Sequence, residues 1–167
     1  TTTMQPGRCM YIHAEESASE DTPLVLSCEN SWRPNRSYWR RWPIIPCFLD
    51  EWTKEDKNQE FTYTESDKTI HDNEREWKLC HQGGLLGLCD YGSITYWTSR
   101  WFSRTATEWS YESEYQTLET TKRGTKYLAK VRKVKKWQRT YMRPFSDNSS
   151  REDGKAKWRI EYCWKNF

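Results

Sequence analysis

The residues best suited to chemistry form a basic segment between Lys122 and Arg143. This segment contains ten Lys and Arg residues and no Asp or Glu among its 22 positions. At its centre, Val131–Lys136 (VRKVKK) carries one basic pair on each side of a valine, a pattern common in proteins that bind sulfated glycans. Cations this close repel one another, and a bound polyanion would relieve the repulsion. The predicted polyanion-binding residues are Lys126, Lys130, Arg132, Lys133, Lys135, Lys136 and Arg139.

The same basic segment has a second interpretation as a solvated face that offsets acidic residues of the same chain. Residues 50–76 hold ten Asp and Glu against four Lys and Arg, and the whole chain has a formal net charge of only +3. Internal pairing would therefore neutralise much of the basic segment. Both interpretations remain open at this point.

A second cluster mixes arginine with aromatic side chains. Guanidinium groups stack on indole rings, and Trp, Tyr and Arg are the residues that dominate protein interfaces. The cluster is therefore either a structural ladder within a sheet or a protein-binding surface. Its predicted interface residues are Trp32, Arg36, Trp39, Arg40, Arg41 and Trp42.

The cysteines predict disulfides rather than a metal site. Their number is even, and the closest pair has eight residues between its members, which is too many for a zinc-type C-x₂₋₄-C pair. Fifteen pairings are possible, and the sequence does not choose among them. Disulfides place the protein in an oxidising compartment, so we expect a secreted protein or an extracellular ectodomain. The six are Cys9, Cys28, Cys47, Cys80, Cys89 and Cys163.

No catalytic motif is present. The three histidines, His13, His71 and His81, lie in no recognisable active-site pattern, and the chain has no G-x-S-x-G, H-E-x-x-H or glycine-rich phosphate loop. We therefore expect a binding protein without enzymatic activity, cofactor or metal. Two sequons, at Asn35 and Asn148, predict N-glycosylation and agree with an extracellular location.

The composition favours a β-rich domain with an aromatic core. Leu, Ile, Val and Phe make up 23 of 167 residues, but 26 aromatic side chains, 11 of them Trp, offer large apolar surfaces. Residues 94–102 have strand composition, while Trp109–Leu118 and Lys157–Trp164 alternate apolar and polar side chains. We therefore expect a sandwich or barrel. No apolar run approaches the roughly 20 residues of a membrane-spanning helix.

One helix is predicted in this β-rich chain, over residues 126–142. Tyr127, Val131, Val134, Trp137 and Tyr141 recur at steps of four, three, three and four, which is helical spacing. Thr125 could serve as the N-cap, and Pro144 would end the helix. The domain prediction is a polar N-terminal segment, residues 1–22, tethered by Cys9, followed by one β-rich domain over residues 23–167.

Two families resemble parts of the chain. Cys28, Trp39 and Cys80 resemble the Cys…Trp…Cys frame of an immunoglobulin domain, which would imply an ectodomain. The length, the late helix and a terminal strand with Cys163 resemble a lipocalin, which would imply a carrier of a small hydrophobic ligand and a bridge from Cys163 to Cys80 or Cys89.

The main functional hypothesis is a secreted recognition module that binds an extracellular protein surface, a sulfated heparin-like glycan, or both. A role as a pathogen- or parasite-secreted protein that contacts host molecules fits this description. Nucleic acid is not expected as a partner, because disulfides indicate an extracellular protein. The sequence leaves the oligomeric state open.

Overall fold

The computed structural model describes residues 4–17, 23–28, 44–53, 56–74, 76–82, 84–89, 105–136 and 139–163. These residues form fourteen strands and three short 3-10 helices. In the first half of the chain the elements are β1 (Cys9–Ala14), η1 (Glu15–Ser17), β2 (Leu24–Ser27), β3 (Ile44–Pro46), β4 (Phe48–Glu51), η2 (Lys57–Gln59), β5 (Phe61–Thr64), β6 (Thr69–Asp72), β7 (Lys78–Gln82) and β8 (Leu85–Cys89). In the second half they are β9 (Thr105–Ala106), β10 (Trp109–Glu112), β11 (Thr117–Lys122), β12 (Thr125–Lys136), β13 (Arg139–Asp147), η4 (Gly154–Ala156) and β14 (Trp158–Tyr162).

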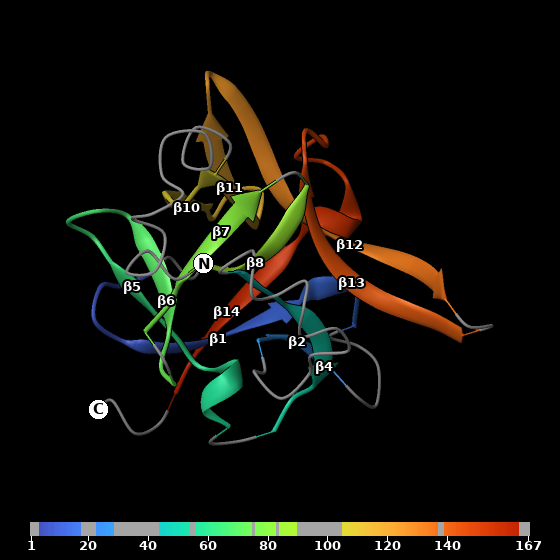
Figure 1. The fold of residues 1–167 in the computed structure, drawn as a ribbon, viewed down its shortest axis with the longest axis horizontal. Helices are drawn as coiled ribbons and strands as arrows, with labels where there is room; N and C mark the ends of the chain where they lie inside the picture. The colour runs from blue at the N-terminus through green and yellow to red at the C-terminus, as the bar shows by residue number, and fades with distance from the viewer. Residues whose placement is uncertain are drawn as a thin grey trace.

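The strands form one curled antiparallel sheet, a half-barrel (Figure 1). Its main path runs β10-β11-β12-β13-β8-β7-β6-β5-β1-β2-β4, and β14, β3 and β9 pair with β1, β8 and β7. The first and last strands lie side by side, with Met10 opposite Tyr162 and Ala14 opposite Trp158. The prediction of a mainly β protein is confirmed. Among the described helices, none has the length and apolar character needed to cross a membrane.

The predicted helix over residues 126–142 is wrong, because this stretch is the β12–β13 hairpin. Nine residue pairs, from Leu128 with Asp147 to Lys136 with Arg139, hold the two strands in register. In Figure 1 the far end of this orange ribbon extends beyond the body of the sheet. The helical spacing of apolar residues was misleading because pairing with β13 satisfies the β12 backbone, and tertiary context of this kind overrides local pattern.

The proposed helix start is a hairpin turn. Arg123 and Gly124 have positive φ values of 52° and 78°, and Lys122 pairs with Thr125 across the two-residue loop. Two consecutive positive φ angles are the signature of a type I′ turn, in which glycine is favoured because it has no Cβ. The turn joins β11 to β12 and presents Arg123 at its tip.

The core combines aliphatic side chains with a few large rings. Trp109, Trp158 and Phe61 are at most 1% exposed and pack with residues such as Leu79 and Leu88. The indole N–H groups of both buried tryptophans have hydrogen-bond partners. Trp109 Nε1 donates to the Leu79 carbonyl and Trp158 Nε1 donates to the Ala129 carbonyl, both at 2.9 Å. These bonds remove the cost of burying a polar group with each ring.

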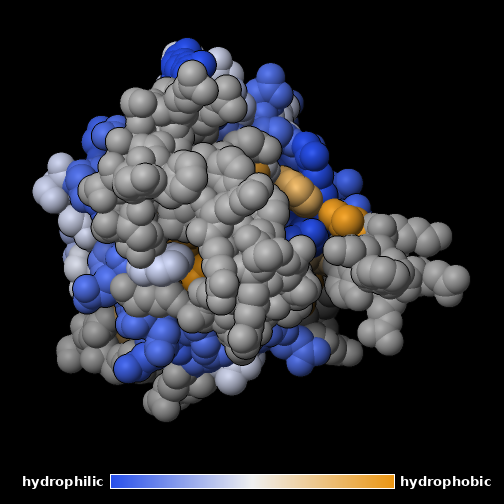
Figure 2. Space-filling model, viewed as in Figure 1, coloured by the Kyte–Doolittle hydropathy of each residue, from blue (hydrophilic) through white to orange (hydrophobic). Residues whose placement is uncertain are grey.

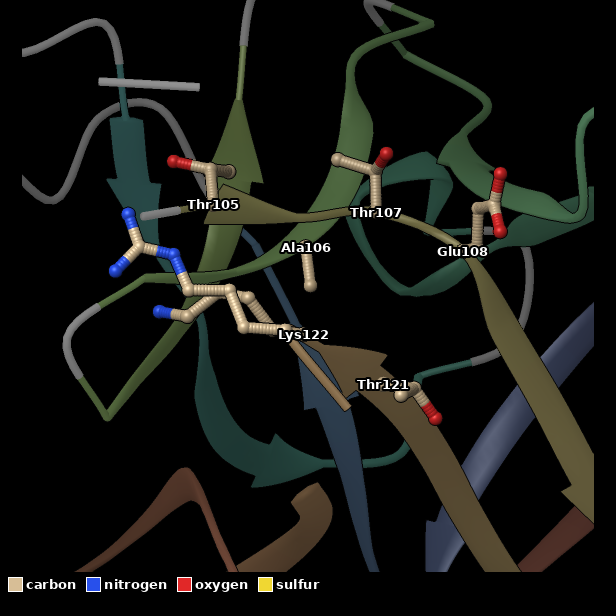
Figure 3. A pocket seen from close by; sticks show the side chains of 7 residues that line it. Thr105, Ala106, Thr107, Glu108, Thr121 and Lys122 are labelled. Atoms are coloured by element: carbon tan, nitrogen blue, oxygen red, sulfur yellow. The ribbon is translucent and has the colours of Figure 1, made fainter. Parts of the chain in front are cut away.

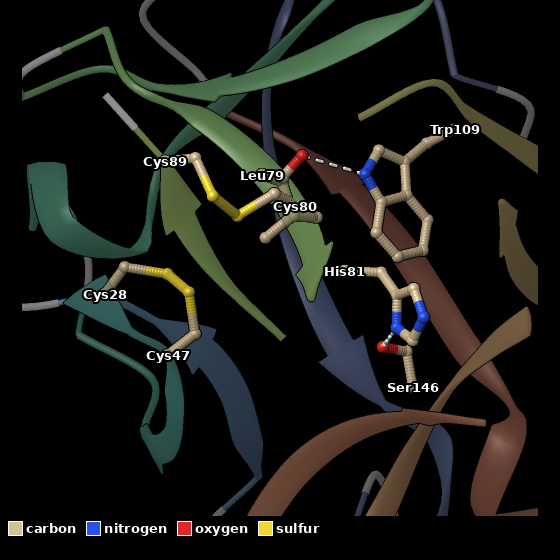
Figure 4. The surroundings of a disulfide bond; sticks show 8 residues. All are labelled: Cys28, Cys47, Leu79, Cys80, His81, Cys89, Trp109 and Ser146. Atoms are coloured by element: carbon tan, nitrogen blue, oxygen red, sulfur yellow. Dashed lines mark hydrogen bonds between the residues drawn. A yellow bond between two sulfur atoms is a disulfide. The ribbon is translucent and has the colours of Figure 1, made fainter. Parts of the chain in front are cut away.

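All six cysteines form disulfides, which confirms that part of the prediction. The bridges are Cys9–Cys163, Cys28–Cys47 and Cys80–Cys89. The pairing of Cys163 that the lipocalin resemblance implied is therefore wrong. Figure 4 shows two of the bridges. Cys80–Cys89 joins β7 to β8, and Cys28–Cys47 joins the residue after β2 to the residue before β4.

The N-terminal segment contributes a central strand. All six residues of β1 are buried, and β1 pairs with β14, β2 and β5. The predicted interface cluster, the sequon at Asn35 and the predicted strand over residues 94–102 lie outside the described residues. That cluster comprises Trp32, Arg36, Trp39, Arg40, Arg41 and Trp42.

Candidate functional site

An open pocket of about 430 Å³ lies where β9 and the following link meet the β11–β12 turn. Figure 3 shows Thr105, Thr107 and Glu108 along one side of it and Thr121 and Lys122 along the other. Its lining comprises three threonines, one lysine, one arginine, one glutamate and one alanine. The lining residues are Thr105, Ala106, Thr107, Glu108, Thr121, Lys122 and Arg123.

Buried contacts below the pocket fix its walls. The Thr120 hydroxyl donates to the Glu108 carbonyl at 2.7 Å, which ties the β9–β10 link to β11. The Trp109 backbone N–H donates to the Lys68 carbonyl at 2.8 Å, and the Trp109 ring is buried in the core. On the other side, Ala106 pairs with His81 of β7. The polar lining is therefore built on a rigid part of the sheet, as a selective binding site requires.

A stack of buried His81 on half-buried Tyr127 supports the cationic side of the pocket. The His81 ring stacks on the Tyr127 ring with centroids 4.3 Å apart, and Lys122 Nζ lies 5.8 Å from the centroid of that Tyr127 ring. His81 Nδ1 is hydrogen-bonded to the Ser146 hydroxyl, as Figure 4 shows. His81 and Ser146 are both buried, so this pair cannot reach a substrate from its present position.

The His81 imidazole is neutral at physiological pH. Burial lowers its pKa to about 4, and the positive charge of Lys122 acts in the same direction. A neutral imidazole stacks on Tyr127 without repelling Lys122. The His81–Ser146 contact therefore stabilises the sheet behind the pocket, and nothing in its geometry provides a nucleophile that solvent can reach.

The predicted polyanion-binding residues of the basic ribbon β12–β13 fall into two groups along the hairpin. Three of these residues contact carboxylates of the same chain. Lys126 Nζ lies 3.5 Å from Glu119, Lys130 Nζ lies 2.9 Å from Asp153, and Arg132 pairs with Asp147. The Lys130 ammonium lowers the pKa of Asp153 by a hydrogen bond. These partners lie on β11, at the end of β13 and in the loop before β14, and none belongs to the acidic block 50–76.

The other end of the ribbon carries the remaining predicted cations. Lys133 is exposed and forms no ion pair with any carboxylate in the described part of the chain. Lys135 and Lys136 follow it at the end of β12, and Arg139 opens β13 opposite Lys136. The backbone thus brings Lys133, Lys135, Lys136 and Arg139 to one end of the hairpin, about one strand length from the pocket.

The buried carboxylate of Glu119 anchors the loop between β13 and β14, which carries Asp153. The Arg151 guanidinium donates two hydrogen bonds to Glu119, both 2.8 Å long, and the Thr117 hydroxyl donates a third at 2.5 Å. Burial raises the pKa of Glu119, but the hydrogen bonds from Arg151 and Thr117 outweigh it and leave the pKa lower than usual. Asn148, the second predicted glycosylation site, is exposed in the same loop.

A group of metal-ligating atom types occurs at the end of the sheet. The Cys9 and Cys163 sulfurs and a Glu60 oxygen lie within 4.8 Å of one another, and all three residues are buried. The two sulfurs are bonded to each other, so neither is the thiolate that a zinc site needs. This group is therefore a bridge beside a carboxylate.

Sequence reasoning missed the pocket. Its threonines belong to a short segment, Thr105–Glu108, with no charge cluster or motif. Only the adjacent cations Lys122 and Arg123 fell within the predicted basic segment. Glycine is favoured in tight turns between two strands, so Gly124 could have indicated that these cations lie at the end of a hairpin.

The described part of the surface is mainly hydrophilic in the view of Figure 2. No family model matches the sequence, and no curated protein matches it. Several solved structures have a similar fold. The solution structure of the mdaA-1 domain has a TM-score of 0.62 at 9% identity, with 96% of this chain and 93% of that chain covered.

The second is the C-terminal domain of an earthworm lectin, a mutant in complex with 6′-sialyllactose. It has a TM-score of 0.60 at 11% identity and covers 93% of this chain and 98% of that one. The third is GalNAc-T7 with UDP, GalNAc and Mn²⁺, with a TM-score of 0.56 at 12% identity, covering 95% of this chain but 23% of that one. At these identities the similarity establishes the fold: the chain shares its β architecture with a lectin domain.

Proposed function

We propose that this chain is a non-enzymatic carbohydrate-binding module that binds anionic glycans at the pocket formed by Thr105–Glu108 and Thr121–Arg123. The observation that carries the proposal is the composition of that pocket. Three hydroxyls and one carboxylate can exchange hydrogen bonds with sugar hydroxyls, and two adjacent cations can bind a carboxylate or sulfate group. A concave surface with a few polar groups on a rigid frame is a usual form of a ligand site.

The charge arrangement favours an acidic sugar over a neutral one. Lys122 and Arg123 are consecutive, and the turn places both at the pocket, while Glu108 supplies one opposing charge. Arginine binds planar carboxylates through two parallel hydrogen bonds. The earthworm lectin domain with a similar fold was solved with 6′-sialyllactose, a glycan that carries one carboxylate, and this supports the same ligand class here.

The pocket gives less support to the alternative of a hydrophobic carrier. A carrier needs an enclosed cavity lined by apolar side chains. The pocket is open, and alanine is its single apolar residue. Three disulfides are compatible with work outside the cell, where glycans on surfaces and secreted proteins would be the partners.

Calorimetric titration with 6′-sialyllactose and with lactose tests this function. The two sugars differ by the acidic residue, so the unmodified protein should bind 6′-sialyllactose at least about tenfold more tightly. The double variant K122Q/R123N should lose that preference. Asn at position 123 tolerates the positive φ of the turn, so the variant removes charge without straining the backbone.

The matched control is K133Q, which removes an exposed cation of the ribbon and leaves the pocket intact. Its affinity for 6′-sialyllactose should stay within about twofold of the unmodified protein. Equal binding of lactose and 6′-sialyllactose, or an unchanged affinity in K122Q/R123N, would refute the assignment of an anionic glycan to this pocket.

A further inference from the structure

Trp52 is the large hydrophobic side chain that the described surface leaves exposed, with 38% of its area accessible. It directly follows β4, and the residues on both sides of it, Glu51 and Thr53, are exposed as well. Trp52 thus presents part of a large apolar ring to solvent beside polar groups that can exchange hydrogen bonds.

The backbone around Trp52 is held on both sides by one buried amide. Gln59 is 1% exposed, and its Nε2 donates to the Glu51 carbonyl while its Oε1 accepts from the Thr53 N–H, both at 2.8 Å. The Trp52 N–H itself donates to the Pro23 carbonyl at 3.2 Å. Three hydrogen bonds thus fix the segment that presents the ring.

The indole also rests on two buried rings of β1. The Tyr11 ring meets it edge to face, with centroids 5.8 Å apart at 83°, and the His13 ring lies 6.3 Å away at 46°. Both supporting residues are at most 3% exposed. A ring fixed in this way loses little conformational entropy when it binds a ligand, which is the advantage of a preorganised contact.

The charges near Trp52 differ in sign from those of the pocket. Asp50 and Glu51 precede it in the chain. Glu161, with 43% of its side chain exposed, has a carboxylate oxygen 2.8 Å from His13 Nε2. Arg159, the register partner of His13, adds one exposed cation. Three carboxylates against one guanidinium disfavour an anionic ligand here.

From this arrangement we infer that Trp52 and Glu161 form a second saccharide subsite, which takes an uncharged hexose. A pyranose ring has one face of C–H bonds, which packs on an exposed indole, and a rim of hydroxyls, which donate hydrogen bonds to a carboxylate. The inference deepens the proposed function and rests on it. It adds a neutral-sugar contact to the anionic pocket, carried by β4 and β14 rather than by the β11–β12 turn.

Fluorine NMR on protein labelled with 5-fluorotryptophan tests the subsite directly. The W52F variant identifies the Trp52 signal, because that signal alone disappears. Methyl β-galactoside, methyl β-glucoside and N-acetylglucosamine are then titrated separately. At least one should shift the Trp52 resonance along a saturable curve. If none of the three shifts it at tens of millimolar sugar, the subsite does not exist, and a flat protein-binding role for Trp52 gains support.

Variants define the role of each group. Saturation-transfer NMR on the responding sugar should show about tenfold weaker binding for W52A and for E161Q. W52F keeps an aromatic ring, so its affinity for the sugar should stay within about threefold of the unmodified protein. This variant also shows whether position 52 tolerates substitution. E65Q removes an exposed carboxylate from the β5–β6 turn and should leave binding unchanged. Equal effects of E161Q and E65Q would overturn the role of Glu161.

The two sites fail independently. W52A should keep its affinity for the acidic part of 6′-sialyllactose at the pocket, and K122Q/R123N should keep the response of Trp52 to the neutral sugar. Loss of the Trp52 response with intact, charge-dependent sialyllactose binding would refute the second subsite alone. Loss of sialyllactose binding in every form of the protein would refute the proposed function.

Discussion

Arg132 and Arg143 stand directly opposite each other on β12 and β13, so two guanidinium groups share one register position. Like charges directly opposite in a sheet destabilise it. The structure compensates with Asp147, which pairs with Arg132, and with the Phe145 ring, whose centroid lies 5.4 Å from the Arg132 guanidinium carbon. The carboxylate that balances the ribbon thus comes from its own second strand.

Replacing Asp147 with Asn should lower the free energy of unfolding by about 0.5–1 kcal/mol. Asn keeps an oxygen for the Ser149 N–H, which donates to Asp147 at 3.1 Å, so the change isolates the lost charge. Urea unfolding of D147N and the unmodified protein measures the difference, which should shrink in 1 M NaCl because salt screens the remaining repulsion. A loss that does not depend on salt would contradict this account.

The fold class could be predicted from the sequence because it depends on patterns within single strands. The alternation of Trp158, Arg159 and Ile160 predicted one buried and one exposed face, and Trp158 and Ile160 are buried as expected. The β12–β13 hairpin could not be predicted this way. Its apolar residues fit a helix, and its strand state depends on pairing with residues 139–147.

The candidate pocket was still harder to predict. Thr105 and Thr121 are sixteen positions apart and carry no motif, and they meet because β9 pairs with β7 and lies beside β11. Likewise, nothing in the sequence near Trp52 indicated that Gln59 would fix its backbone. These contacts arise from the sheet topology, which single-strand patterns do not encode.

The bridge between Cys9 and Cys163 should contribute most among the disulfides. It spans 154 positions, whereas Cys80–Cys89 spans nine. A bridge stabilises mainly by restricting the unfolded chain, and the chain-entropy model gives about 5 kcal/mol for the long loop and about 2.5 kcal/mol for the short one. Denaturant unfolding of C9A/C163A should therefore show about twice the loss of C80A/C89A. All four cysteines are buried, so the pairs lose similar packing; equal losses would argue against loop entropy as the cause.

Acid should destabilise the protein through His81. The pKa of His81 is lowered to about 4 in the folded state, against an ordinary value of 6.5. Between these values the unfolded chain binds a proton that the folded chain does not. The stability that the neutral, buried His81 contributes to the folded state is therefore fully present above pH 6.5 and is lost as the pH falls toward 4. Urea unfolding at pH 7.5 and pH 4.5 should show a lower free energy at the acidic pH.

The variant H81Q should reduce this pH dependence because it removes the titrating group. Other residues also titrate in this range, so the decisive quantity is the change between variants. H71Q, at a half-buried histidine of β6, is the control and should keep the full dependence of the unmodified protein. If H81Q and H71Q behave alike, the His81–Tyr127 stack is not the source of the acid sensitivity.

The two groups of cations on the basic ribbon should differ in their effect on polyanion binding. Lys126, Lys130 and Arg132 have carboxylate partners, whereas Lys133, Lys135 and Lys136 occupy the far end of β12. Both triplets carry three positive charges, so K126S/K130S/R132S and K133S/K135S/K136S have the same net charge. A sulfated polymer responds to the local density of charge, and carboxylates of this chain already partner all three residues of the first triplet. The far-end variant should therefore lose retention on a heparin column, while the paired variant should keep most of it.

The variant that keeps most of its heparin retention should be the one that loses more stability. The first variant removes the cationic partners of three carboxylates, Glu119, Asp153 and Asp147. The loss matters most at Glu119, because its side chain is only 4% exposed and a buried carboxylate is costly without its cations. The paired variant should unfold at lower urea than the far-end variant. Retention that falls equally in both would mean that heparin responds to net charge alone. Retention that falls only in the paired variant would place the polyanion contact at the base of the ribbon, where a bound sulfate would have to compete with the three carboxylates.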